Sequence, residues 1–133
     1  MKEVLIDTSV WIDFLNGTVN SQSDAMTRAI EQDAEIFICR PVIQEVLQGI
    51  SDDQEHYNLK EKLFSLNILI IDPLDAALGA SELYRTLRKK GISIRKTNDT
   101  LIAFYCIYYN IPILHKDRDF NAISKHSKLK IFR

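Results

Sequence analysis

Four short apolar segments, separated by longer amphipathic ones, constrain the fold of this chain most strongly. They are Glu3–Asp7, Glu35–Cys39, Asn67–Ile71 and Ile111–Leu114. Short apolar strands that alternate with amphipathic helices are typical of an α/β fold, in which helices cover both faces of a mainly parallel sheet. Because strand–helix–strand crossovers are right-handed, the carboxyl ends of such strands lie along one edge of the sheet. The sequence therefore predicts one edge at which side chains from distant segments meet.

The segments between the strands carry helix signals. Asn16-Gly17, Gly49 and Gly91 are stop signals, and Pro41 and Pro73 suit the first turn of a helix. The longest expected helix ends near Lys90 and has one apolar face, formed by Leu74, Ala77, Leu78, Tyr84 and Leu87. The other expected elements are helices over 9–15, 21–32, 41–49, 53–66 and 97–109 (capped by Thr97 or Asn98), a helical turn over 120–124, and a last short strand over 129–132.

Length and composition indicate one soluble domain that spans residues 1–133. The chain is 46% hydrophobic and 26% charged, which is ordinary for a globular protein. No apolar run approaches the roughly 20 residues of a membrane span, and Asp7 and Asp13 interrupt any signal peptide. Cys39 and Cys106 lie in apolar surroundings, so we expect reduced core thiols in a cytoplasmic protein.

A net charge of −1 conceals a strong asymmetry along the chain. Residues 1–84 hold five basic and fifteen acidic residues, whereas residues 85–133 hold twelve basic and three acidic residues. The basic part could attract a polyanion such as RNA by neutralising its phosphates. Solvated surface charge, with attraction between the two parts, explains the same pattern, so charge permits a nucleic-acid partner without requiring one.

Four acidic residues, Asp7, Glu45, Asp99 and Asp117, occupy positions that should converge on one edge of the sheet. Each lies just beyond a strand end or in the first turns of a helix, where ligands bind in parallel α/β folds. Taken singly, Asp7 and Asp99 could be helix caps, Glu45 could lie on an exposed helix flank, and Asp117 could belong to a polar turn. The coincidence of all four favours a functional site.

Carboxylates held close together repel one another unless cations neutralise them. Oxygen ligands without accompanying cysteine or paired histidine favour Mg²⁺ or Mn²⁺ over Zn²⁺. Such a site can activate water for phosphodiester hydrolysis. Ser9 could orient one of the acids or cap the first helix. His115 and the aromatic run Phe104–Tyr109 are interpreted as mainly structural, and the glycine-rich nucleotide-binding motifs are absent from the sequence.

The segments around these acids resemble those of the PIN-domain ribonucleases, and the chain is similar in size to the VapC toxins. The matching segments, in family order and spacing, are Leu5–Ile12, Pro41–Gly49, Asn98–Ala103 and His115–Phe120. Each motif is weak alone, but the ordered set spans nearly the whole chain and is specific.

The resemblance implies a three-layer α/β/α sandwich and a metal-dependent endoribonuclease, the toxin of a toxin–antitoxin pair. It also implies Mg²⁺ or Mn²⁺ as cofactor, an RNA substrate such as tRNA, a VapB-like antitoxin and a homodimer. Asp7 and Asp99 would be direct metal ligands, Glu45 would hold the reacting water, and Asp117 would complete the pocket. Asp119 is the alternative fourth acid.

Two other function classes remain open from the sequence. A non-catalytic module with the same fold would bind RNA or protein through the basic part of the chain. A phospho-acceptor signalling domain also uses Mg²⁺ and clustered acids, but it would require paired acids after the first strand, and Asp7 has no acidic neighbour.

Overall fold

All four strands of the central sheet run parallel, in the order β3-β2-β1-β4. The computed structural model describes residues 2–133. The strands are β1 (Glu3–Ile6), β2 (Glu35–Cys39), β3 (Asn67–Leu69) and β4 (Ile113–Leu114). In register, Leu5 of β1 pairs with Phe37 of β2 on one side and with Ile113 of β4 on the other. The predicted parallel sheet is therefore confirmed.

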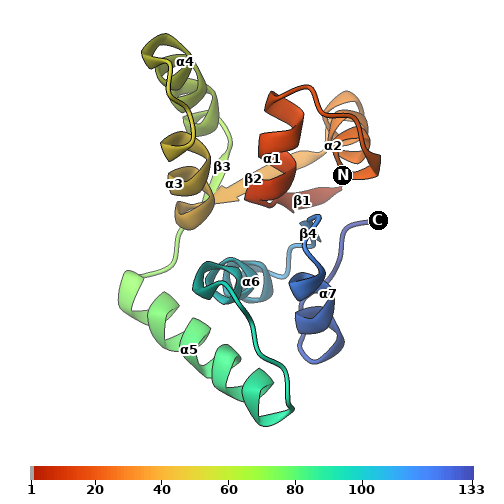
Figure 1. Cartoon of the computed structure of the whole chain (residues 1–133), viewed down its shortest axis with the longest axis vertical. Helices are drawn as coiled ribbons and strands as arrows, with labels where there is room; N and C mark the ends of the chain where they lie inside the picture. The colour runs from red at the N-terminus through yellow and green to blue at the C-terminus, as the bar shows by residue number, and fades with distance from the viewer. Residues whose placement is uncertain (1) are drawn as a thin grey trace.

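Helices cover both faces of this sheet and complete a three-layer α/β/α sandwich. In the view of Figure 1, α1, α2 and α4 lie toward the top, α3 lies beside β2 and β3, and α5 to α7 lie below the strands. The helices are α1 (Thr8–Leu15), α2 (Ser21–Glu31), α3 (Arg40–Gln48), α4 (Asp53–Phe64), α5 (Pro73–Lys89), α6 (Thr97–Tyr109) and α7 (Arg118–Lys125). None of these helices is both long and apolar enough to cross a membrane.

The core is centred on β1, whose Val4, Leu5 and Ile6 are fully buried. A strand with neighbours on both edges and helices on both faces has no solvent-facing side, which explains its unbroken apolar run. Cys39 and Cys106 are buried free thiols in the same core. The predicted core role of the two cysteines is therefore confirmed.

Helix α5 differs from the sequence prediction in the face that it buries. Leu74 and Leu78 are 68% and 58% exposed, whereas Ala76, Ala80 and Leu87 are buried. Leu87 of the predicted face is buried as expected, but in the first part of α5 small residues form the packing face because the helix lies close against α6. A Cβ atom placed on Gly79 would come within 2.1 Å of the Phe104 ring. Leu74 and Leu78 are consequently left on the outside.

Three smaller predictions were wrong at their edges. The strand expected to reach Ile71 ends at Leu69, and the last strand is reduced to a single parallel bridge between Ile113 and Ile131. Helix α6 has Lys96 at its N-cap position, without a side-chain cap. The cap residue is therefore neither Thr97 nor Asn98. Asp99, the acid in the first turn of α6, does not occupy the cap position either.

Candidate functional site

Asp7 lies where β1 ends and α1 begins, and it is both a helix cap and a buried acid. Its Oδ2 accepts hydrogen bonds from the Ser9 backbone N–H at 3.2 Å and from the Ser9 hydroxyl at 2.7 Å. The residue is only 5% exposed. Burial raises the pKa of the Asp7 carboxyl, and the hydrogen bonds from Ser9 partly offset that rise. Asp7 therefore caps α1 and is also placed as a candidate site residue.

Glu45 comes to the same region from the middle of α3. Thr8, the first residue of α1, donates its hydroxyl to Glu45 Oε1 at 2.9 Å. Both Asp7 and Glu45 contribute to the raised pKa of the buried Cys39 thiol, which burial chiefly lifts to about 12. The two carboxylates therefore lie near one buried sulfur atom, one held by Ser9 and the other by Thr8.

The three remaining acids, Asp99, Asp117 and Asp119, form the most compact group. Each offers a carboxylate oxygen, and these oxygens all lie within 4.8 Å of one another. Asp99 projects from the first turn of α6. Asp117 is the N-cap of α7, and its Oδ1 accepts the backbone N–H of Asp119 at 2.9 Å. The structure thus brings both alternatives for the fourth acid, Asp117 and Asp119, to Asp99.

Asp99 is the least compensated carboxylate in the group. It is 6% exposed, and its Oδ2 is buried without a hydrogen-bond partner in the described part of the chain. Burial, with smaller contributions from the negative charges of Asp7 and Asp117, raises the pKa of Asp99 to about 7. An unpaired buried carboxylate oxygen is costly, so this position is chemically suited to a cation.

Two cations, Arg95 and Lys96, border this group. The sequence interpretation had counted them only as members of the basic part of the chain. Arg95 Nη2 lies 3.6 Å from Asp117 Oδ1, and Arg95 Nε donates to Asp119 Oδ2 at 3.4 Å. Lys96 Nζ is 4.0 Å from Asp117 Oδ2. Both cations sit directly before α6 and both are largely exposed. The signal that could have identified them is their position immediately upstream of the helix that carries Asp99.

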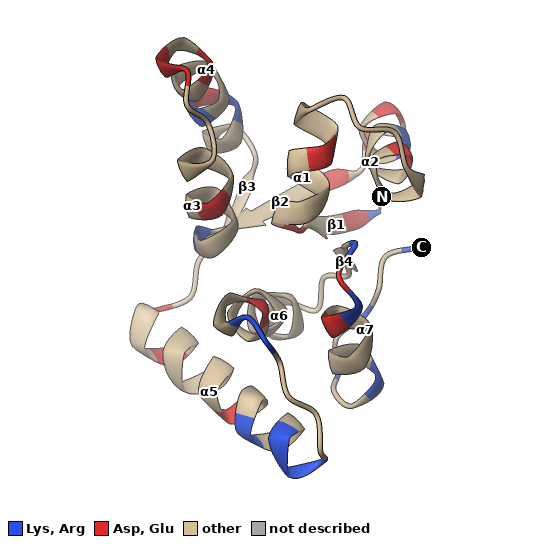
Figure 2. Ribbon diagram, viewed as in Figure 1, with Lys and Arg blue, Asp and Glu red and all other residues tan. Residues whose placement is uncertain are grey.

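Arg95, Lys96 and Asp117 line an open hollow. Its volume is about 450 Å³, and it is lined by Ser9, Arg95, Lys96, Lys116, Asp117 and Arg118. Figure 2 shows acidic residues at the starts of α6 and α7 with basic residues beside them. A negative centre bordered by cations can hold a metal ion and the phosphates that accompany it.

His115 and the aromatic run have largely structural roles in the structure. His115 is buried, its ring lies 5.2 Å from that of Phe120, and burial lowers its pKa. In the aromatic run, Tyr105 is buried while Tyr108 and Tyr109 are exposed. The run packs into the core on one face only, so its structural interpretation is confirmed in part.

Comparison with known proteins places this geometry in context. A family model described as PIN domain matches residues 4–126. Two proteins are 33% identical over 128 residues, which is 96% of this chain and 96% of each relative. They are VapC ribonuclease Mb1587 of Mycobacterium bovis and ribonuclease VapC11 of Mycobacterium tuberculosis.

Solved structures show the same fold. VapBC-1 from nontypeable Haemophilus influenzae has a TM-score of 0.74 at 17% identity, and covers 98% of this chain and 96% of that chain. VapBC2 from Rickettsia felis, bound to a DNA fragment from its promoter, has a TM-score of 0.70 at 22% identity, with coverage of 98% and 97%. At these identities the likeness concerns the fold alone.

Proposed function

The chain belongs to the PIN-domain family, and from that membership and its acidic centre we propose that it is an endoribonuclease, the toxin of a toxin–antitoxin pair. The observation that carries the proposal is the buried, unpartnered Oδ2 of Asp99 among Asp7, Asp117 and Asp119. The relatives that share 33% of the sequence are named as ribonucleases, which supports RNA as the substrate. We propose a single-stranded or loop region, such as that of a tRNA, as the cleaved segment.

The residues of the acidic centre fit a divalent cation. Three carboxylate oxygens within 4.8 Å offer hard ligands without a cysteine or histidine among them, the set preferred by Mg²⁺ or Mn²⁺. Asp99, with Asp117 or Asp119, would hold the ion, and Asp7 would lie beside it. When bound, the ion neutralises the acids and supplies an activated water for phosphodiester hydrolysis.

The protein's own residues then have distinct tasks. The Ser9 hydroxyl fixes the orientation of Asp7. Thr8 occupies Oε1 of Glu45, which leaves Oε2 as the acceptor for a proton of the attacking water. Arg95 and Lys96, both exposed beside Asp117, bind the phosphate that is cleaved and keep its charge near the acids.

We also propose two protein partners. The similar solved structures are titled as VapBC complexes, which supports a VapB-like antitoxin as the natural inhibitor. A homodimer is supported by the apolar side chains that α5 and the end of α6 leave exposed, notably Leu74, Leu78 and Tyr108. Leu78→Glu would place a charge in such an interface.

Cleavage of RNA with added Mn²⁺ tests the proposed activity. Asp7→Asn and Asp99→Asn should each lose about a thousand-fold in rate, because each removes a negative charge from the metal environment. Asp53→Asn is the matched control, since Asp53 is exposed in the first turn of α4. Undiminished cleavage by the two site variants would reject the proposal, and RNA binding without cleavage by the wild type would favour the non-catalytic module.

A further inference from the structure

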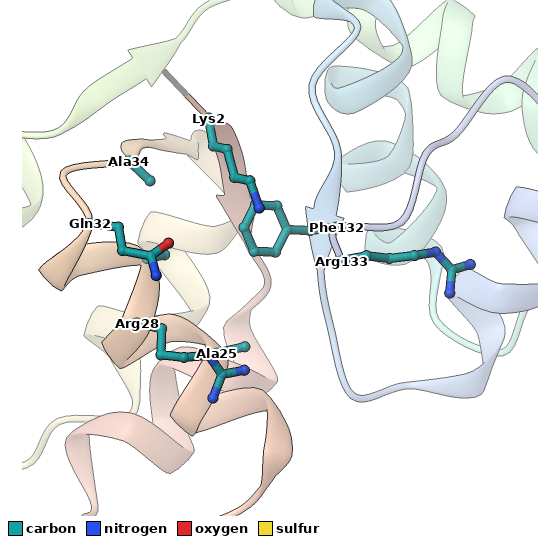
Figure 3. A pocket seen from close by; sticks show the side chains of 8 residues that line it. Lys2, Ala25, Arg28, Gln32, Ala34, Phe132 and Arg133 are labelled. Atoms are coloured by element: carbon teal, nitrogen blue, oxygen red, sulfur yellow. The ribbon is translucent and has the colours of Figure 1, made fainter.

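A second, basic groove runs between α2 and the C-terminal segment. It consists of two adjoining hollows of about 310 and 330 Å³, which share Ala25, Arg28, Phe132 and Arg133 in their walls. In Figure 3, Arg28 and Gln32 come from α2 on one wall, and Lys2 and Phe132 come from the other. Among the described residues 2–133, no acidic side chain lines either hollow.

The charge that Lys2 and Arg28 bring to this groove is opposite to the net charge of the part of the chain that carries them. Residues 1–84 contain only five basic residues against fifteen acidic ones, yet two of the five, Lys2 and Arg28, line this groove. Within residues 2–133, no ion pair involves Lys2, Arg28 or Arg133. Lys2 Nζ lies over the Phe132 ring, 5.8 Å from its centroid. Cations without acidic partners are available to an anionic ligand.

The groove is continuous with the candidate site. Lys116 lines both the hollow beside Asp117 and the nearer hollow of the groove, where His115 and Asn121 accompany it. Cationic side chains thus extend from Arg95 and Lys96 at the acids, through Lys116, which pairs with Asp13, to Arg28 and finally Lys2. A chain of cations that leads away from a nuclease centre matches the regular negative charges of a nucleic-acid strand.

We infer that the groove of Lys2, Arg28 and Arg133 binds the phosphodiester backbone of the RNA flank that extends from the cleaved bond. The inference rests on the proposed ribonuclease function, since it takes RNA as the ligand. Phe132, whose ring lies at the end of the Lys2 side chain in Figure 3, offers a surface on which a flanking base stacks. The groove contributes affinity for long substrates and takes no part in the chemical step.

Binding of labelled oligouridine, measured by fluorescence anisotropy in EDTA so that no cleavage occurs, tests the inference. The variant Lys2→Gln/Arg28→Gln should weaken binding of a strand of about 16 nucleotides roughly 10- to 30-fold at about 0.1 M salt. Its plot of log affinity against log salt should be flatter by about 1.4, the value for two lost phosphate contacts on a single strand. A strand of about 4 nucleotides, too short to span both regions, should bind equally well to both proteins.

The matched control is Lys60→Gln/Lys62→Gln on α4. It removes the same charge from the same acidic part of the chain, and Lys60 lies over Tyr57, as Lys2 lies over Phe132. This control should bind the long strand like the wild type, and so should Lys2→Arg/Arg28→Lys, which keeps the charge. Thermal unfolding of every variant verifies that it is folded.

Three results would overturn the inference. The first is equal weakening by the two double glutamine variants, which would indicate general charge attraction. The second is unchanged binding of the long strand by Lys2→Gln/Arg28→Gln. The third is a loss confined to a poly-glutamate probe, which would assign the groove to an acidic peptide. In each case Mn²⁺-dependent cleavage that Asp99→Asn abolishes would leave the proposed function intact. Failure of the wild type to bind any RNA would reject both.

Discussion

The acids of the candidate site fall into two groups that are stabilised differently. Asp7 and Glu45, carried by the first half of the chain, each accept a hydrogen bond from a neighbouring hydroxyl, that of Ser9 or Thr8. The second group, Asp99, Asp117 and Asp119, comes from the second half. Asp117 and Asp119 form ion pairs with Arg95 or Lys96, whereas within residues 2–133 Asp99 forms no ion pair and its buried Oδ2 accepts no hydrogen bond.

The first group is thus oriented by hydroxyls, whereas the charge of the second group is partly compensated by cations. A hydroxyl fixes the direction of a carboxylate but leaves its charge in place, whereas a cation removes the repulsion among several carboxylates. The exposed Arg95 and Lys96 compensate Asp117 and Asp119 only in part, because solvent screens their charges. The second group should therefore depend most on a bound metal ion, and the first should depend on its hydroxyls.

Metal affinity gives the largest expected contrast between the groups. Asp99→Asn should weaken Mn²⁺ binding about 100-fold, since it removes a ligand from the compact group. Glu45→Gln should weaken it ten-fold at most, because Glu45 lies outside the set of oxygens within 4.8 Å of one another. Titration calorimetry of the two variants measures both values. Equal losses would show that the two groups bind the ion together.

The pH dependence of stability tests the second group without metal. The pKa of Asp99 rises from 3.8 to about 7 on folding, mainly through burial. Between these values the unfolded chain has lost the proton that the folded protein keeps, so the stability of the metal-free protein should fall as pH rises from about 4 to about 7 and then level off. The loss should be on the order of 2 kcal/mol, measured by urea unfolding.

Two variants make this pH profile specific to Asp99. Asp99→Asn has no proton to lose, so its profile should be flatter across the same range, whereas Asp53→Asn on exposed α4 should keep the slope of the wild type. Saturating Mn²⁺ should restore stability at neutral pH by binding the folded state. A slope that persists in Asp99→Asn would assign the effect to another group.

The sequence predicted the parallel sheet and the edge at which the acids meet, because the alternation of strands and helices determines both. It could not rank the acids, since Asp117 and Asp119 are two residues apart and both reach Asp99. Hydrogen bonds between distant segments, such as that from Thr8 to Glu45, depend on how α1 and α3 pack. The first part of the buried face of α5 was predicted wrongly, at Leu74 and Leu78, because close packing on α6 favours alanine and glycine there.

The smallest expected effects concern the hydroxyls of the first group, and they test whether orientation alone matters there. Ser9→Ala and Thr8→Val should each lower RNA cleavage about ten-fold, as loss of an outer-shell partner typically does. Ser9 also lowers the pKa of Asp7, so Ser9→Ala should move the acidic limb of the pH–rate profile to higher pH, with part of the rate regained there. Thr8→Val, which removes the hydrogen bond to Glu45, should lower the rate by a similar factor. Equal losses of rate with no shift of the limb in Ser9→Ala would show that both hydroxyls act on orientation alone.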